Sequence, residues 1–230
     1  INAFVYQFDP TKKGGDRVGP FVTWQFQDRV LLDRPETTGR KGLVWCYEHD
    51  QSIAWEKSRE MGASWLALIF EDWLCIFHKH VQCLNISRSA NAVESKTKNS
   101  LFTKLRFMHE HLPTWLSGDI LEEKMYFGFS RTRSEITGEA STKKSGVGGR
   151  GSPIMVDEAA EIEDDSELFE KLASTGNCRI FISTHLGTGT KFYDLTENPD
   201  YVKIQMHWTQ HPAKNHGLYS WDVERKELHW

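Results

Sequence analysis

The stretch WEKSREMGASW, residues 55–65, has the character of a phosphate-binding loop with two altered positions. The standard pattern is G-x-x-x-x-G-K-[ST], in which backbone N–H groups hold phosphates, the lysine neutralises them and the hydroxyl binds Mg²⁺. Gly62 and Ser64 fit this pattern. Lys57 stands in place of the first glycine, and Ala63 stands in place of the lysine. The stretch therefore predicts a phosphate loop that lacks its usual cation.

A neighbouring basic side chain could supply this charge. The loop needs a cation near the β- and γ-phosphates, but the side from which the cation approaches does not matter. Lys57 and Arg59 are the candidates. Residues 63–80 carry apolar side chains at helical spacing, so Ser64 falls in a first helical turn, where N–H groups and the helix dipole favour an anion. A glycine turn before an ordinary amphipathic helix would leave the same local pattern.

A second stretch, SPIMVDEAAEIED at residues 152–164, places an apolar run directly before Asp157 and Glu158. A buried strand that ends in two acids suits an NTPase, since the first carboxylate can hold Mg²⁺ and the second can orient or deprotonate the attacking water. A strand followed by an acidic helix start is the structural alternative. The loop and the acids in this order favour the NTPase interpretation.

Composition is that of a globular protein. The chain has 230 residues, 39% hydrophobic and 26% charged, which suits one large α/β domain, and no apolar stretch is long enough to cross a bilayer. The formal net charge of −4 argues against a surface that binds nucleic acid throughout. Local basic patches could still contact phosphates, with Lys12, Lys13, Lys143 and Lys144 as the candidates.

The cysteines show no metal-ligand spacing, and we interpret them as reduced thiols of a cytosolic protein. They are Cys46, Cys75, Cys83 and Cys178.

Strand and helix patterns alternate along the rest of the chain, which predicts a parallel sheet. Residues 1–20 and 140–151 are expected to be loops. Strands are expected at residues 43–47, 81–87, 125–129, 134–139, 154–157, 179–183 and 201–207. Helices are expected from residue 63, at 88–112, at 164–174 and at 191–195.

Two further polar positions are candidates for ligand contact. Gln27 can make a two-point hydrogen bond to an adenine edge, with Phe26 or Trp24 available to stack. An ordinary helix N-terminus with a packed aromatic residue is the alternative. Ser183 and Thr184 follow an apolar strand, where α/β sheets bind ligands, although such residues are also common in turns.

Taken in order, these pieces resemble the ATPase domain of the large terminase subunit, the viral DNA-packaging motor of tailed phages. KSREMGAS matches that family's phosphate loop, which carries its basic residue at the front. WQFQDRVLL matches its adenine-contacting glutamine motif, IMVDEAAEI its metal-binding Asp and catalytic Glu, and ISTHLGTGTKFY its coupling motif. The likeness extends over residues 20–212.

The resemblance implies an ASCE-type P-loop NTPase, a mainly parallel central sheet flanked by helices, that hydrolyses ATP with Mg²⁺. Glu158 would activate water, and Ser64 and Asp157 would hold the metal. The coupling residues would be Ser183, Thr184 and His185. The ATP-binding residues would be Lys57, Ser58, Arg59, Glu60, Met61, Gly62, Ala63, Ser64 and Gln27.

The resemblance also implies partners. Family motors act as homo-oligomeric rings on the portal protein, with double-stranded DNA and the small terminase subunit, in the host cytoplasm and transiently docked on the procapsid. An arginine can complete a neighbouring subunit's site, and Arg150 is the first candidate, with Arg131 and Arg133 behind it. An isolated domain is compatible with a monomer, and no membrane contact is expected.

The expected organisation has three parts: an N-terminal arm at residues 1–19, a P-loop ATPase domain at 20–212, and a tail at 213–230 that leads toward a nuclease domain. We expect no nuclease activity from this piece.

Two other functions fit parts of the pattern. A different DNA translocase or helicase-like ATPase would share the site but would lack the displaced basic residue and carry strand-separating motifs. A hydrolysis-deficient nucleotide-binding scaffold would explain Ala63 as decay, but intact Asp157 and Glu158 argue against it.

Overall fold

A mixed, mostly parallel sheet forms the centre of the computed structural model, which describes residues 4–8, 17–97, 99–141, 152–162, 165–173, 175–215, 220–222 and 227–229. In the described part of the chain the sheet has eight strands in the order β10-β3-β9-β8-β4-β7-β6-β5. The strands from β10 to β7 are parallel, and β6 and β5 add to the edge antiparallel. The bounds are β3 (Ile53–Lys57), β4 (Gln82–Ser87), β5 (Ile120–Glu123), β6 (Tyr126–Phe129), β7 (Ser134–Ala140), β8 (Ile154–Asp157), β9 (Arg179–Ser183) and β10 (Val202–Met206). The predicted fold class is confirmed.

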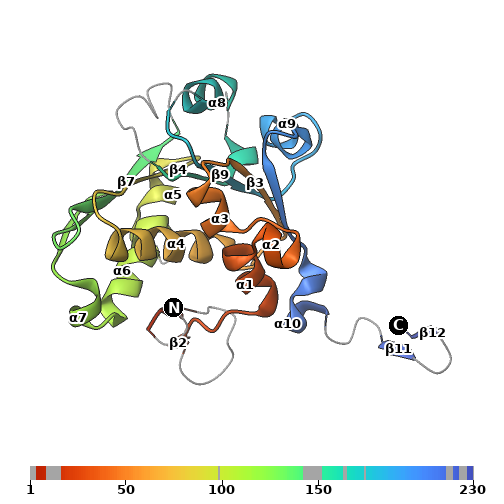
Figure 1. The fold of residues 1–230 in the computed structure, drawn as a ribbon, viewed down its shortest axis with the longest axis horizontal. Coiled ribbons are helices and arrows are strands. Elements are labelled where there is room, and N and C mark those ends of the chain that lie inside the picture. The colour runs from red at the N-terminus through yellow and green to blue at the C-terminus, as the bar shows by residue number, and fades with distance from the viewer. Residues whose placement is uncertain are drawn as a thin grey trace.

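Helices cover both faces of this sheet (Figure 1). On one face lie α1 (Gln25–Leu32), α3 (Leu43–Glu48), α4 (Ala63–Phe77) and α6 (Leu101–His111), and on the other lie α8 (Asp165–Ala173) and α9 (Lys191–Glu197). The shorter helices are α2 (Pro35–Thr38), α5 (Ala90–Val93), α7 (Thr114–Ser117), α10 (Pro212–Asn215) and the 3₁₀ turns η1 (Ala159–Glu161) and η2 (Trp208–Gln210).

The side chains of β8 show how the strands build two cores. Met155 packs with α4 and α6, whereas Ile154 and Val156 pack with α8 and α9 on the opposite face. Successive side chains of a strand point to opposite faces, so a strand covered on both sides is apolar throughout. This is why apolar and polar side chains do not alternate in the run before Asp157.

Helix α4 lies between the sheet and the surrounding helices. Its buried side chains include Leu66, Leu68, Ile69 and Phe70, which point in different directions around the helix. A helix that is apolar nearly all round is a buried one, and its position in the core fixes where the preceding loop can sit.

Two predicted elements are wrong. Residues 43–47 form helix α3 rather than a strand, because Leu43 and Cys46 share one buried face at helical spacing. A run of five apolar residues does not distinguish the two conformations by itself. The single helix expected at residues 88–112 is interrupted between α5 and α6. There the Ser95 N–H donates to Ser100 Oγ at 3.1 Å, a local bond that competes with helical pairing.

The N-terminal segment also differs from the expected loop. Strands β1 (Tyr6–Phe8) and β2 (Val18–Pro20) pair antiparallel, and Phe21 N–H donates to the Val5 carbonyl at 2.7 Å. The other expected strands and helices are present within a few residues of their predicted bounds. The strands β11 (Ser220–Asp222) and β12 (Glu227–His229) pair in the tail. The three-part domain organisation stays a prediction.

Several predicted residues lie outside the described part of the chain: Lys12, Lys13, Lys143, Lys144 and Arg150. All four cysteines are buried and free. None of the helices among the described residues is long and apolar enough to span a bilayer.

Candidate functional site

The loop between β3 and α4 turns sharply through two residues in the left-handed region. Glu60 has φ of 55° and Gly62 has φ of 77°. Left-handed residues next to right-handed ones make concave backbone sites of the kind that bind anions. Gly62 is the N-cap of α4, so the positive end of this helix faces the loop. Both features favour an anion at this loop, while its role as a phosphate loop stays a prediction.

The first acid after β8 is joined directly to the start of α4. Ser64 Oγ donates to Asp157 Oδ2 at 2.8 Å, although the two residues are 93 positions apart. A hydroxyl and a carboxylate are the hard oxygen ligands that Mg²⁺ prefers, and Mg²⁺ usually takes one or two protein groups together with phosphates and water. No cluster of three His, Cys, Asp or Glu able to hold a metal occurs among the described residues. The pair fits Mg²⁺ that arrives with a phosphate ligand.

Glu158 is held by an arginine that sequence reasoning missed. Arg88 Nε lies 2.8 Å from Glu158 Oε2, and Arg88 also pairs with Glu161. Burial and the adjacent Asp157 carboxylate raise the pKa of Glu158, and Arg88 opposes this shift. Glu158 itself has φ of 57°, an uncommon conformation for a residue with a side chain. The signal in the sequence is a charged residue directly after the buried strand β4.

The predicted coupling residues lie at the end of β9 and directly after it. Ser183 is buried at the end of β9, and its Oγ accepts from the Ala160 N–H at 3.1 Å. His185 Nε2 lies 3.4 Å from Glu56 Oε1 on β3, and Thr184 lies between Ser183 and His185 in the sequence. The structure thus places Ser183 beside the turn that follows Glu158 and His185 beside β3, while the role of all three residues in coupling stays a prediction.

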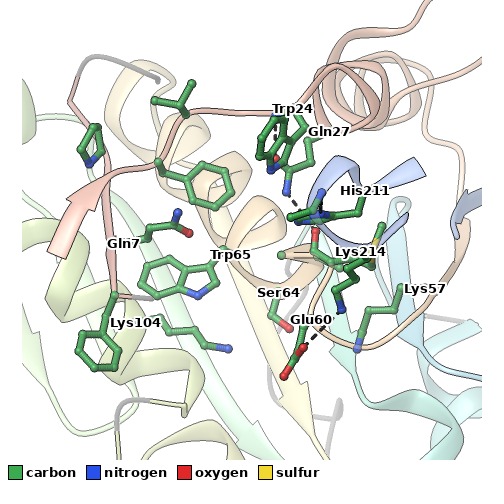
Figure 2. A pocket seen from close by; sticks show the side chains of 18 of the residues that line it. Gln7, Trp24, Gln27, Lys57, Glu60, Ser64, Trp65, Lys104, His211 and Lys214 are labelled. Carbon is green, nitrogen blue, oxygen red and sulfur yellow. Dashed lines mark hydrogen bonds and ion pairs between the residues drawn. The ribbon is translucent and has the colours of Figure 1, made fainter. Parts of the chain in front are cut away.

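A pocket of about 760 Å³ opens above the phosphate loop (Figure 2). Seven of the nine predicted ATP-binding residues line it: Lys57, Glu60, Met61, Gly62, Ala63, Ser64 and Gln27. Ser58 and Arg59 are outside the lining. The Ser58 hydroxyl accepts from the Trp208 N–H at 3.1 Å, and the Arg59 side chain is exposed. Of the two candidates for the displaced cation, Lys57 is the one that faces the pocket.

Gln27 contacts the loop with its amide. Nε2 donates to the Met61 carbonyl at 3.0 Å, and Oε1 accepts from the Trp24 N–H at 2.9 Å. Each amide atom therefore has a protein partner already, and an adenine contact stays a prediction. Of the two candidate stacking residues, Trp24 lines the pocket and is 44% exposed, whereas Phe26 is buried.

Two lysines of the pocket lie on elements far from the loop along the chain, and neither belongs to a recognised sequence motif. Lys104 belongs to α6, and Lys214 belongs to α10, where its Nζ donates to the Arg59 carbonyl at 2.5 Å. Sequence reasoning missed both, because neither residue is close to the loop along the chain.

Arg131 and Arg133, the further candidates for an arginine that completes a neighbouring subunit's site, lie near the C-terminal end of α4. Arg131 donates to the carbonyls of Ile76 and Leu116, at 3.3 and 2.6 Å, and Arg133 follows in the same turn between β6 and β7. These contacts give Arg131 a structural part within its own chain.

No protein-family model matches this chain, and no curated protein matches it in sequence. Solved structures do match. The ATPase domain of the Thermus phage P74-26 large terminase is 17% identical, with a TM-score of 0.54 over 77% of this chain and 86% of that one. The large terminase of a thermophilic bacteriophage, solved in complex with ADP, is 13% identical, with a TM-score of 0.57 over 81% and 45%. The HK97 bacteriophage large terminase is 14% identical, with a TM-score of 0.57 over 90% and 42%.

The chain therefore matches phage large terminase ATPase domains in fold over most of its length, at low sequence identity. It spans less than half of the ADP-bound terminase chain and of the HK97 terminase chain.

Proposed function

We propose that this chain is an ATP-hydrolysing motor domain of a viral large terminase, which drives double-stranded DNA into a procapsid. The observation that carries the proposal is the 2.8 Å bond between Ser64 and Asp157. It brings the phosphate loop and the acid strand together as a P-loop NTPase site requires. The pocket above the loop supplies the space for a nucleotide, and one terminase of similar fold was solved with ADP.

Each residue of the site then has a chemical task. The loop backbone and Lys57 would bind the phosphates, and Ser64 and Asp157, which are bonded to each other, would hold Mg²⁺. Mg²⁺ bound there would neutralise charge on the phosphate oxygens. Glu158 orients the attacking water and accepts its proton. Its raised pKa brings it closer to neutral pH, where a general base is most effective.

Arg88 holds the Glu158 carboxylate and opposes the rise in its pKa. The base is therefore restrained in one position, which favours proton transfer from a correctly placed water.

Translocation of DNA requires assembly with other proteins. We propose a homo-oligomeric ring on the portal protein in the host cytoplasm, with the small terminase subunit as a partner and Arg150 acting on the neighbouring site. The fold likeness to terminase ATPase domains supports this assembly. Ser183, bonded to the loop that follows Glu158, would pass the state of the site to β9.

The test is ATP turnover with Mg²⁺ for the wild type, Glu158→Gln and Glu161→Gln. Loss of the Glu158 base should lower turnover by about 100-fold or more, with nucleotide affinity largely kept. Glu161 is the matched control, because it pairs with the same Arg88 but does not directly follow the strand. Normal turnover in Glu158→Gln would refute the assignment. Nucleotide binding by the wild type without turnover at any protein concentration would favour the scaffold function.

A further inference from the structure

The phosphate loop has no lysine at the position that normally neutralises the β- and γ-phosphates. Ala63 occupies this position, and its methyl group is buried. A bound triphosphate is a concentrated negative charge, and the acids at positions 157 and 158 would repel it. Lys57 supplies one cation from the end of β3. Of the other two lysines in the pocket lining, Lys214 is bonded to the Arg59 carbonyl, and a second lysine lies on the side opposite to Lys57.

This second lysine, Lys104, occupies an unusual place on α6. The buried residues of this helix are Leu101, Phe102, Leu105 and Met108, and Lys104 borders this buried stripe at the i+3 position from Leu101. An apolar side chain would be expected there. The stripe packs on α4, which fixes the direction of the helix and therefore that of the lysine.

The ammonium of Lys104 is directed into the nucleotide pocket. Figure 2 shows Lys104 and Lys57 reaching toward Ser64 from opposite sides. Within the described residues no acidic side chain lies at ion-pair distance from Lys104. Burial lowers the pKa of Lys104, the Asp157 carboxylate opposes this shift, and the neighbouring Lys57 adds to it. A partly buried cation without a paired anion is costly for the folded protein, which indicates that a ligand completes the site.

We propose that Lys104 binds the terminal phosphate of the nucleoside triphosphate and, with Lys57, replaces the lysine that is missing from the loop. This inference rests on the proposed function and names a further binding residue for the same site. The terminal phosphate is the one expected, because Lys104 reaches toward Ser64, whose hydroxyl is bonded to Asp157 directly before Glu158, the acid assigned to activate water (Figure 2). Lys104 should therefore distinguish a triphosphate from a diphosphate.

The test compares binding of a non-hydrolysable ATP analogue and of ADP, both with Mg²⁺, by calorimetry. The variants are Lys104→Met, Lys104→Arg and the control Lys124→Gln, an exposed lysine in the turn between β5 and β6. Lys104→Met should weaken analogue binding by about tenfold or more, as expected for loss of a charged hydrogen bond, and ADP binding by less than about threefold. Lys104→Arg should recover most of the analogue affinity, and Lys124→Gln should match the wild type.

Thermal unfolding without nucleotide is the second readout. Lys104→Met removes a partly buried charge and completes the apolar stripe, so this variant should unfold at the wild-type temperature or above it. A lysine with a purely structural role would instead lower the unfolding temperature and weaken the analogue and ADP equally, and this result would overturn the proposal. So would unchanged analogue binding in Lys104→Met while Ser64→Ala loses it. A wild type that binds neither nucleotide would refute the proposed function itself.

Discussion

Gly62 offers a sharp test of how the phosphate loop is built. Its φ of 77° lies in the left-handed region, and a Cβ at this position would meet Gln27 Nε2 at 2.8 Å. Gly39 has a similar φ of 70°, but a Cβ there would meet nothing within 4 Å. Substitution of each glycine by alanine therefore separates backbone strain from the contact with the glutamine.

The left-handed conformation alone should cost Gly39→Ala about 1–2 kcal/mol of unfolding free energy. Gly62→Ala carries the same strain and also displaces the Gln27 amide from the Met61 carbonyl. A buried amide left without its partner costs a further ~1–3 kcal/mol, so the total should be about 2–5 kcal/mol.

Urea unfolding of the single variants, Gln27→Ala and the Gly62→Ala/Gln27→Ala double variant measures both terms. With the amide removed, Gly62→Ala should cost only about as much as Gly39→Ala, since the strain of about 1–2 kcal/mol remains and the clash is gone. Equal destabilisation by Gly62→Ala and Gly39→Ala in the wild-type background would refute this account of the loop. Strict additivity in the double variant would do the same.

Two further predictions concern titrating groups. Arg88→Gln removes a charge that lowers the pKa of Glu158, so this pKa should rise further. The acid limb of the pH profile for ATP turnover should then move to higher pH. An acid limb that does not move would argue against Glu158 as the base. For His109, burial lowers the pKa, but Asp72, bonded at 2.7 Å, outweighs it and the net shift is upward. A raised pKa in the folded state stabilises the protein below the unfolded value of about 6.5, and this contribution disappears as the pH rises through the raised value. Urea unfolding across this pH range should show a fall in the unfolding free energy of the wild type but not of Asp72→Asn. The same pH dependence in both proteins would contradict a stabilising His109–Asp72 pair.

The elements that sequence reasoning identified correctly carry their signal in consecutive residues. The apolar run of α4, the run before Asp157 and the turn at residues 62–64 are local patterns, and each has the expected structure. Errors occurred where the local signal was short or mixed. The five residues at 43–47 suit either conformation, and the hydroxyl groups near Ser95 end a helix that periodicity alone would continue.

The site divides in the same way. The sequence by itself determined the altered phosphate loop, the order of Asp157 and Glu158, and the strand that leads to Ser183, because each motif is continuous along the chain. The fold class followed from the alternation of strands and helices. The absence of the usual lysine at position 63 also followed from the spacing of Gly62 and Ser64 in the phosphate-loop pattern.

Only the tertiary structure decided which side chains meet. The sheet order β3-β9-β8-β4 brings Ser64 to Asp157 and places Arg88 beside Glu158, and the packing of α6 on α4 turns Lys104 toward the loop. The residues of each pair are separated by tens of positions in the sequence, and a local sequence pattern does not indicate which distant residues come into contact. Strand order and helix packing are properties of the whole core, which is why Arg88 and Lys104 became visible only in the folded chain, whereas Lys57 belongs to the loop motif itself.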